Sequence, residues 1–190
     1  LLMVLAGCMV PSLLIAAAQG ESSSIMGFGS VIAICVITGF ILYHRFKSQS
    51  RQSLRSRDGF LVVAASWFIA SLAGCLPFII SGSMPNFFDA FFETASGFTT
   101  TGSTILTDIE ILPRSDLFWR SFTHWIGGMG IIVFITAILP AFGINGQIVA
   151  NAETTGPTKD KIAAKFSDNS KGIYTIYFVM TLLQTLLLKL

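Results

Sequence analysis

The chain has 190 residues, of which 53% are hydrophobic and 12% are charged, and its mean hydropathy is +0.73. A soluble domain carries about twice that share of charged residues, and here the apolar residues form long blocks, so the composition excludes an ordinary soluble protein and indicates lipid as the solvent. The net charge of +2 excludes a general electrostatic attraction to nucleic acid.

The first two apolar blocks, residues 1–18 and 25–43, predict a pair of membrane-spanning helices, because a bilayer requires roughly 20 apolar residues per helix. Pro11 predicts a kink in the first helix, and Gln19-Gly20-Glu21 is a short polar loop between the two. A cleaved signal peptide is the alternative interpretation of residues 1–18, although that stretch has no basic region at its start.

Three further apolar blocks follow along the chain. Residues 60–80 and 121–140 are each long enough to cross the bilayer, and another block begins near Gly172 and is still apolar at Leu190. Because the chain starts at Leu1 and stops inside an apolar block, we expect it to be a piece of a longer protein.

The charged residues between the blocks predict an orientation. Residues 45–58 carry five Lys or Arg against one acid, and the stretch after the fourth block is also basic, so the positive-inside rule places residues 45–58 and 141–170 in the cytoplasm. Residues 81–118 carry five acids and one base, and we expect them on the outer side. The lysines after the fourth block are Lys159, Lys161, Lys165 and Lys171.

The polar stretch 141–170 predicts a cytoplasmic connector. Pro157 suits the first turn of a short helix over residues 158–166, which would place Ile162 and Phe166 on one face against the membrane surface. An ordinary solvated connector is the alternative.

A short aromatic segment on the outer side predicts a helix that does not span. From residue 86 to residue 96 a helix is about 16 Å long. Asn86 is a good N-cap, Asp89 complements the positive helix end, and Gly97 predicts the stop. These features are typical of a re-entrant helix, with one broad apolar face formed by Phe87, Phe88, Phe91 and Phe92.

The Thr-rich loop that follows predicts a cation-binding wall. Polar backbone is tolerated at membrane depth only beside protein or water, and carbonyls and hydroxyls in such a loop can replace the water around a dehydrated cation. The candidate ion-binding residues are Thr100, Thr101, Gly102 and Ser103. An exposed Thr-rich loop is the alternative, but the capped short helix before it and the glycine-bearing apolar block after it favour the ion-binding interpretation.

Two acids of the short helix have two interpretations. Asp89 and Glu93 lie four residues apart and form either a pore mouth that attracts cations or a helix cap and an ion pair with Arg114 or Arg120. Arg120 and His124 share a helix face and either pair with these acids or reach the membrane interface. A proton-relay role for His124 is a further alternative.

The start of the fourth block predicts tight packing at the outer interface. Trp119 and Trp125 are typical of the membrane–water boundary. Gly127 and Gly130 would let a neighbouring backbone approach this helix closely.

Five stretches together resemble a known family: residues 89–104, 119–121, 125–131, 57–61 and 156–161. They are similar to the first pore repeat of the TrkH-type potassium uptake proteins of bacteria, within the Trk/Ktr/HKT superfamily, and the resemblance covers nearly the whole chain. It implies an all-α membrane protein in which four helix–pore loop–helix repeats, as in potassium channels, surround one pore.

The resemblance also divides the chain. It implies an extra N-terminal transmembrane helix pair at residues 1–44, the cytoplasmic basic loop at 45–58 and the first helix–pore loop–helix repeat at 59–140. Residues 141–170 would be the cytoplasmic connector, and residues 171–190 the start of the second repeat.

The function implied by the resemblance is potassium translocation across the bacterial inner membrane by a pore-forming subunit, with the loop as one quarter of the selectivity filter. It further implies a homodimer, membrane lipid as the surroundings, a cytoplasmic nucleotide-binding regulatory partner of the TrkA type, and no cofactor besides the transported potassium. The loop lacks the Tyr of the Thr-Val-Gly-Tyr-Gly filter of tetrameric channels, so sodium transport within the same superfamily is the nearer alternative.

An intramembrane enzyme is the alternative from another class, with His124 and either Asp89 or Glu93 as acid–base groups. It requires a nucleophile or a metal cluster, and the sequence shows neither an HExxH nor a GxSxG motif. A scaffold or receptor would leave the loop around Gly102 without a purpose. The cysteines have no CxxC spacing and are typical of apolar packing residues: Cys8, Cys35 and Cys75.

Overall fold

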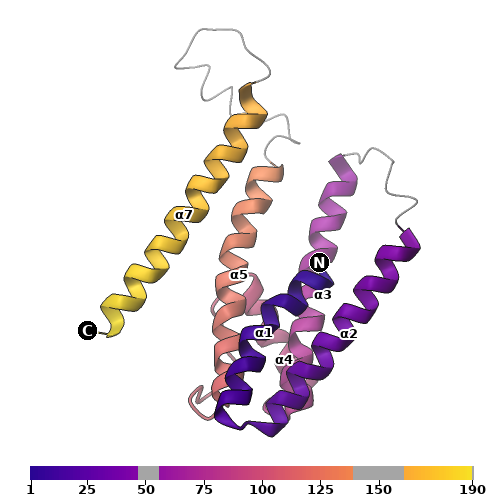
Figure 1. Cartoon of the computed structure of the whole chain (residues 1–190), viewed down its shortest axis with the longest axis vertical. Helices are drawn as coiled ribbons and strands as arrows, with labels where there is room; N and C mark the ends of the chain where they lie inside the picture. Colours follow the sequence, from indigo (N-terminus) through magenta and orange to yellow (C-terminus); the bar gives the residue numbers. More distant parts are fainter. Residues whose placement is uncertain (47–55, 139–160, 190) are drawn as a thin grey trace. The chain divides into compact units, whose positions relative to one another are not determined.

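The computed structural model describes residues 1–46, 56–138 and 161–189, and its regular elements in these ranges are all helices (Figure 1). The all-α prediction is therefore confirmed. The chain divides into two compact units, Leu1–Gly128 and Met129–Leu190. The helices are α1 (Leu2–Gln19), α2 (Ser22–Phe46), α3 (Ser56–Ser81), α4 (Phe87–Phe98), α5 (Arg114–Ile138) and α7 (Lys161–Lys189).

The first two helices form the predicted antiparallel pair, joined by a tight turn (Figure 1). Gly20 makes the turn because it adopts φ 72°, where glycine has no Cβ penalty, and its N–H reaches the carbonyls at the end of α1. Pro11 lies inside α1, which runs on past it. Within the described ranges, three helical stretches are long and apolar enough to cross a membrane: Leu2–Gln19, Ser22–Phe46 and Leu61–Ser81.

Two helices extend beyond their apolar blocks into the predicted basic loop 45–58. The α2 helix continues to Phe46, with His44 and Arg45 in its last turn, where positive charge complements the negative helix end. The α3 helix begins at Ser56. Residues 47–55 lie outside the described part of the chain.

The short helix predicted over residues 158–166 has other bounds in the structure. Instead of a separate helix over residues 158–166 followed by a new one near Gly172, a single helix, α7, runs from Lys161 to Lys189. The polar residues 167–170 carry no proline to end the helix, and Gly172 alone is tolerated in a helix interior. Residues 139–160, including Pro157, lie outside the described part.

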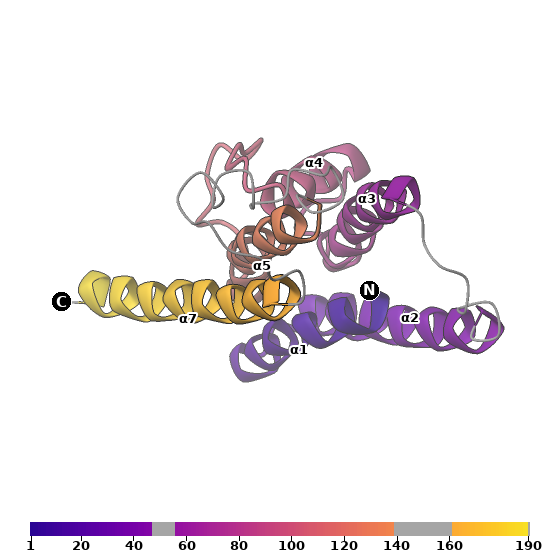
Figure 2. The same cartoon turned by 90° about the horizontal axis from the view of Figure 1, so that it is seen from above.

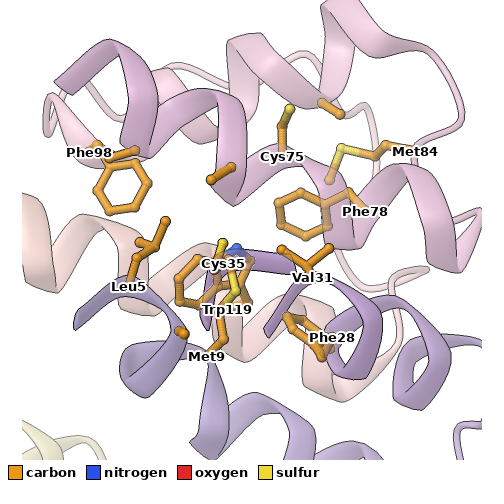
Figure 3. Close-up of a cluster of buried hydrophobic side chains, with 14 of the residues drawn as sticks. Leu5, Met9, Phe28, Val31, Cys35, Cys75, Phe78, Met84, Phe98 and Trp119 are labelled. Atoms are coloured by element: carbon orange, nitrogen blue, oxygen red, sulfur yellow. The ribbon is translucent and has the colours of Figure 1, made fainter. Parts of the chain in front are cut away.

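The first unit is built around one apolar core (Figure 3). The α1 helix packs on α2, α2 on α3 and α3 on α4, and the view in Figure 2 shows the two N-terminal helices beside each other along one side of α3. Trp119 of α5 is fully buried in this core. Its ring meets Phe28 and Phe98 edge-on, with centroids 6.3 Å away in each case, and its Nε1–H donates to the Gly74 carbonyl at 2.9 Å.

Trp119 therefore joins α2, α3 and α4 to the start of α5. The cysteines are free, with Cys35 and Cys75 buried and Cys8 half-buried. The prediction that they are packing residues is confirmed.

Candidate functional site

The short helix α4 begins as its sequence predicts. The side chain of Asn86 accepts a hydrogen bond from the Phe88 N–H at 3.0 Å, which makes Asn86 the N-cap, and Asp89 lies in the first turn. A helix of 12 residues is about 18 Å long, which is too short to cross a bilayer. The structure confirms the predicted N-terminus of this helix and the prediction that it is too short to span the bilayer.

The helix ends two residues later than predicted. It continues through Gly97 to Phe98, and Thr99 is the C-cap. Thr100 then adopts φ 55°, its N–H donates to the Gly97 carbonyl at 2.9 Å, and the Thr101 N–H donates to the Ser96 carbonyl at 2.9 Å. This is a Schellman motif in which Thr100 occupies the left-handed position that glycine usually takes.

Gly97 has a different role from the predicted stop. A Cβ at Gly97 would lie 3.0 Å from the Cβ of Thr123 and closer still to its hydroxyl. On α5, a Cβ at Gly127 would lie 2.8 Å from the Phe98 carbonyl carbon and 2.9 Å from the Gly97 oxygen. The two glycines therefore let the C-terminal turn of α4 lie directly against α5, which confirms the close approach predicted for Gly127.

The loop after α4 is exposed in this chain from Thr99 to Ile105, and hydroxyl groups fix its path. The Thr99 hydroxyl bonds the Ala95 carbonyl at 2.7 Å and lies 2.8 Å from the Thr101 hydroxyl. Gly102 adopts φ 75° with open space around it. The Ser96 hydroxyl donates to the Ser103 carbonyl at 2.6 Å, so the loop folds back onto the helix that precedes it.

Glu93 is the second anchor of the loop. Its side chain is 1% exposed and forms an ion pair with the Nε of Arg120, which is 13% exposed. The other carboxylate oxygen accepts from the Thr104 hydroxyl at 3.1 Å and from the Ile105 N–H at 3.2 Å. Of the two interpretations of Glu93, the structure shows the ion pair with Arg120.

The remaining candidates lie on the same two helices as this network. Asp89 is half-buried, one turn before Glu93 on α4. The Nδ1 of His124 lies 3.0 Å from the carbonyl of Arg120 on its own helix. No group of three or more His, Cys, Asp or Glu side chains suited to a metal ion occurs among the described residues.

The sequence did not predict the residues whose hydrogen bonds fix the Thr-rich loop onto α4. Ser96 and Thr104 act through their hydroxyl groups, and hydroxyl residues next to Thr-rich loops are too common to carry a signal. The Glu93–Arg120 pair had a signal in the opposite charges, but only the fold shows that the two residues, 27 apart in the chain, lie together.

The family model for the TrkH cation transport proteins matches residues 24–189. The chain belongs to the TrkH family. It is 38% identical to the Trk system potassium uptake protein TrkH of Halomonas elongata over 185 residues, which is 95% of this chain and 38% of that protein. It is also 44% identical to TrkH of Escherichia coli K12 over 136 residues, which is 70% of this chain and 28% of that protein.

A solved structure of this family also resembles the chain. The crystal structure of the potassium transporter TrkH from Vibrio parahaemolyticus matches with a TM-score of 0.76 and 33% identity, covering 95% of this chain and 35% of that one. The chain thus spans less than two fifths of the length of the TrkH relatives it matches. Family membership and the three apolar helices make this chain part of a multi-pass membrane protein.

Proposed function

We propose that this chain forms the first of four pore repeats in a potassium uptake protein and that its loop supplies one quarter of a selectivity filter. The ion ligands would be the carbonyls of Thr100, Thr101, Gly102 and Ser103. The observation that carries the proposal is the pair of left-handed residues, Thr100 at φ 55° and Gly102 at φ 75°, in a loop fixed at both ends.

Backbone conformation supports this role because left-handed residues alternating with others change the direction in which successive carbonyls point. A β-branched residue at positive φ costs about 1–3 kcal/mol and persists only where the surroundings impose it. Here the Schellman bonds and the Ser96–Ser103 bond impose it on Thr100.

Charge supports a cation over an anion. The C-terminal end of α4, which carries partial negative charge, leads directly into the loop. Because Arg120 neutralises Glu93, backbone dipoles and hydroxyls, rather than a full carboxylate, would bind the ion. Asp89 remains the candidate for a pore mouth that attracts cations.

The assembly follows from the same proposal. The complete protein would be a pore-forming subunit in the bacterial inner membrane, working as a homodimer with a cytoplasmic nucleotide-binding regulatory subunit of the TrkA type. Residues 45–58 and 141–170 would face the cytoplasm and residues 81–118 the periplasm. Potassium would be the transported ligand, with no resident cofactor and no catalytic residue.

The test compares two glycines with the same backbone conformation. Gly102→Ala in the complete protein should reduce the preference for potassium over sodium in liposome flux, since alanine disfavours φ 75°. Gly82→Ala is the control, because Gly82 has φ 78° and open space but lies between α3 and α4. Equal potassium-to-sodium flux ratios in the two variants and the wild type would contradict the filter role.

Sodium transport is the second candidate, because the loop has one glycine, Gly102, and no aromatic residue between Thr99 and Thr104. The same liposomes separate the two candidates: a sodium flux above the potassium flux in the unmodified protein would favour sodium.

A further inference from the structure

We propose that a small monovalent cation binds at the junction where the turn before α2, the end of α3 and the start of α5 meet, with Asp116 and Ser24 as its principal ligands. This site is separate from the Thr-rich loop and serves to hold the N-terminal helix pair on the pore repeat. It does not depend on the proposed filter.

Asp116 is fully buried and only half satisfied. Its Oδ2 accepts a hydrogen bond from the Ser81 hydroxyl at 3.2 Å, whereas its Oδ1 has no partner. A buried carboxylate oxygen without a partner is costly, and native structures normally satisfy it with a donor, a water or an ion.

An independent hydroxyl faces the same carboxylate. Ser24, in the first turn of α2, is fully buried and its Oγ has no hydrogen-bond partner. Yet Ser24 stands close enough to Asp116 to help lower the pKa of that carboxyl. Ser24 Oγ and Asp116 Oδ1 are thus two buried oxygens that each lack a hydrogen-bond partner, and both can accept a further group.

The two acids of the junction, Asp116 and Glu21, have no basic side chain as an ion-pair partner among the described residues. Glu21 lies near enough to raise the pKa of Asp116 by repulsion. The Glu21 carboxylate already accepts from the N–H groups of Arg114, at 2.8 Å, and Ser115, at 3.2 Å, and from the Ser115 hydroxyl. Asp116 is therefore the carboxylate with a free oxygen.

The ligand set selects the class of ion. One free carboxylate oxygen and hydroxyl oxygens are hard ligands, which suit an alkali cation, whereas calcium takes 6–8 oxygens and usually several carboxylates. Ser83, whose Oγ lies 2.9 Å from that of Ser81, adds a hydroxyl whose proton can go to the Phe78 carbonyl at 3.3 Å, which leaves a lone pair for the ion. The negative end of α3 lies at the same place.

The experiment measures thermal unfolding of the complete protein in detergent, with sodium chloride titrated against choline chloride at constant ionic strength. We expect sodium to raise Tm saturably in the wild type. Asp116→Asn should abolish this rise, and Ser24→Ala should shift its midpoint to at least about tenfold higher sodium. Glu110→Gln, at an exposed acid of the same outer segment, should leave the rise unchanged.

Two results would overturn the proposal: no rise in Tm as sodium replaces choline, or an equal rise in Asp116→Asn. The first would mean that a water or a proton occupies the junction. If Asp116→Asn does not fold, Ser24→Ala decides alone, because removing one hydroxyl leaves the charge unchanged. A Tm rise with potassium that persists in both variants belongs to a different site, such as the filter.

Discussion

Gly127 of α5 lies against the carbonyl group of Phe98, so closely that a Cβ at 127 would stand 2.8 Å from the carbonyl carbon. The neighbour is backbone and cannot turn away, so Gly127→Ala must push α4 and α5 apart. We expect a loss of about 1–3 kcal/mol in stability, which is typical of overpacking, and a larger loss for Gly127→Val. Thermal unfolding and potassium uptake by the complete protein measure both effects.

The control for this prediction is Gly29→Ala. Gly29 also lies within a helix, but a Cβ there would meet nothing within 4 Å. Alanine should be neutral or slightly stabilising at this position. Similar losses in both variants would show that helix propensity, and not the contact with Phe98, causes the effect.

Glu93→Gln tests whether this acid holds the Thr-rich loop in place or attracts ions to the pore mouth. Glutamine removes the negative charge that faces Arg120 in a nearly buried pair, and breaking such a pair costs about 3–5 kcal/mol. We expect lower thermal stability and a weaker preference for potassium over sodium at every ionic strength. A pore-mouth role would instead reduce uptake mainly at low salt, because screening weakens long-range attraction.

The matched control is Asp89→Asn, one turn away on α4 and half-buried. Its effect on stability should be small, since Asp89 forms no ion pair in the described part of the chain. A salt-dependent fall in uptake in this variant would support Asp89 as the pore mouth. If Glu93→Gln shows only a salt-dependent fall in uptake and keeps its thermal stability, Glu93 does not hold the loop in place.

Thr100→Gly should separate stability from selectivity. Glycine adopts φ 55° without the clash that Thr100 suffers, so the variant should be more stable by about 1 kcal/mol. The same change frees the loop to leave the conformation that we propose for ion binding, so the flux ratio of potassium to sodium should fall. A variant with lower stability and an unchanged flux ratio would contradict both expectations.

The pH dependence of stability tests the environment of Asp116, which precedes the predicted span of α5. Burial, and secondarily repulsion from Glu21, raises the pKa of Asp116 above 3.8, although the hydroxyls of Ser83, Ser81 and Ser24 oppose the shift. The folded protein therefore binds this proton more tightly than the unfolded protein does. Its contribution to stability is present at low pH and disappears as pH rises through the folded pKa.

In choline chloride, the Tm difference between wild type and Asp116→Asn should consequently move in favour of the wild type as pH falls from neutrality. Each unit of pKa shift corresponds to about 1.4 kcal/mol. Adding sodium should reduce this pH dependence, because the cation and the proton compete for the same oxygen. A difference in Tm that is constant with pH would show that Asp116 is not perturbed.

Local features of this fold could be predicted from the sequence. The cap at Asn86 and the turn at Gly20 depend on neighbouring residues alone, and both predictions were confirmed. The end of α4 was not predictable in the same way, because glycine is the usual residue at the left-handed position. Here Thr100 occupies it, held by contacts that no helix-stop rule includes.

Features that depend on pairing distant residues could not be fixed by the sequence. The local sequence around Glu93 supported a pore mouth and an ion pair equally. Only the packing of α4 against α5 shows that Glu93 pairs with Arg120. The start of α5 at Arg114 was missed for a similar reason: the apolar block begins at residue 121, whereas the first turn is capped by Glu21, 93 residues earlier.

That separation has a consequence for the order in which the protein is made. A ribosome adds about 5–20 residues per second, so Glu21 emerges roughly 5–20 s before its partners Arg114 and Ser115. During this time the Glu21 carboxylate lacks the N–H partners that it has in the folded chain. Glu21 can join the α1–α2 hairpin to the start of α5 only after Arg114 and Ser115 have been translated. This contact therefore forms after α3 and α4 have been made.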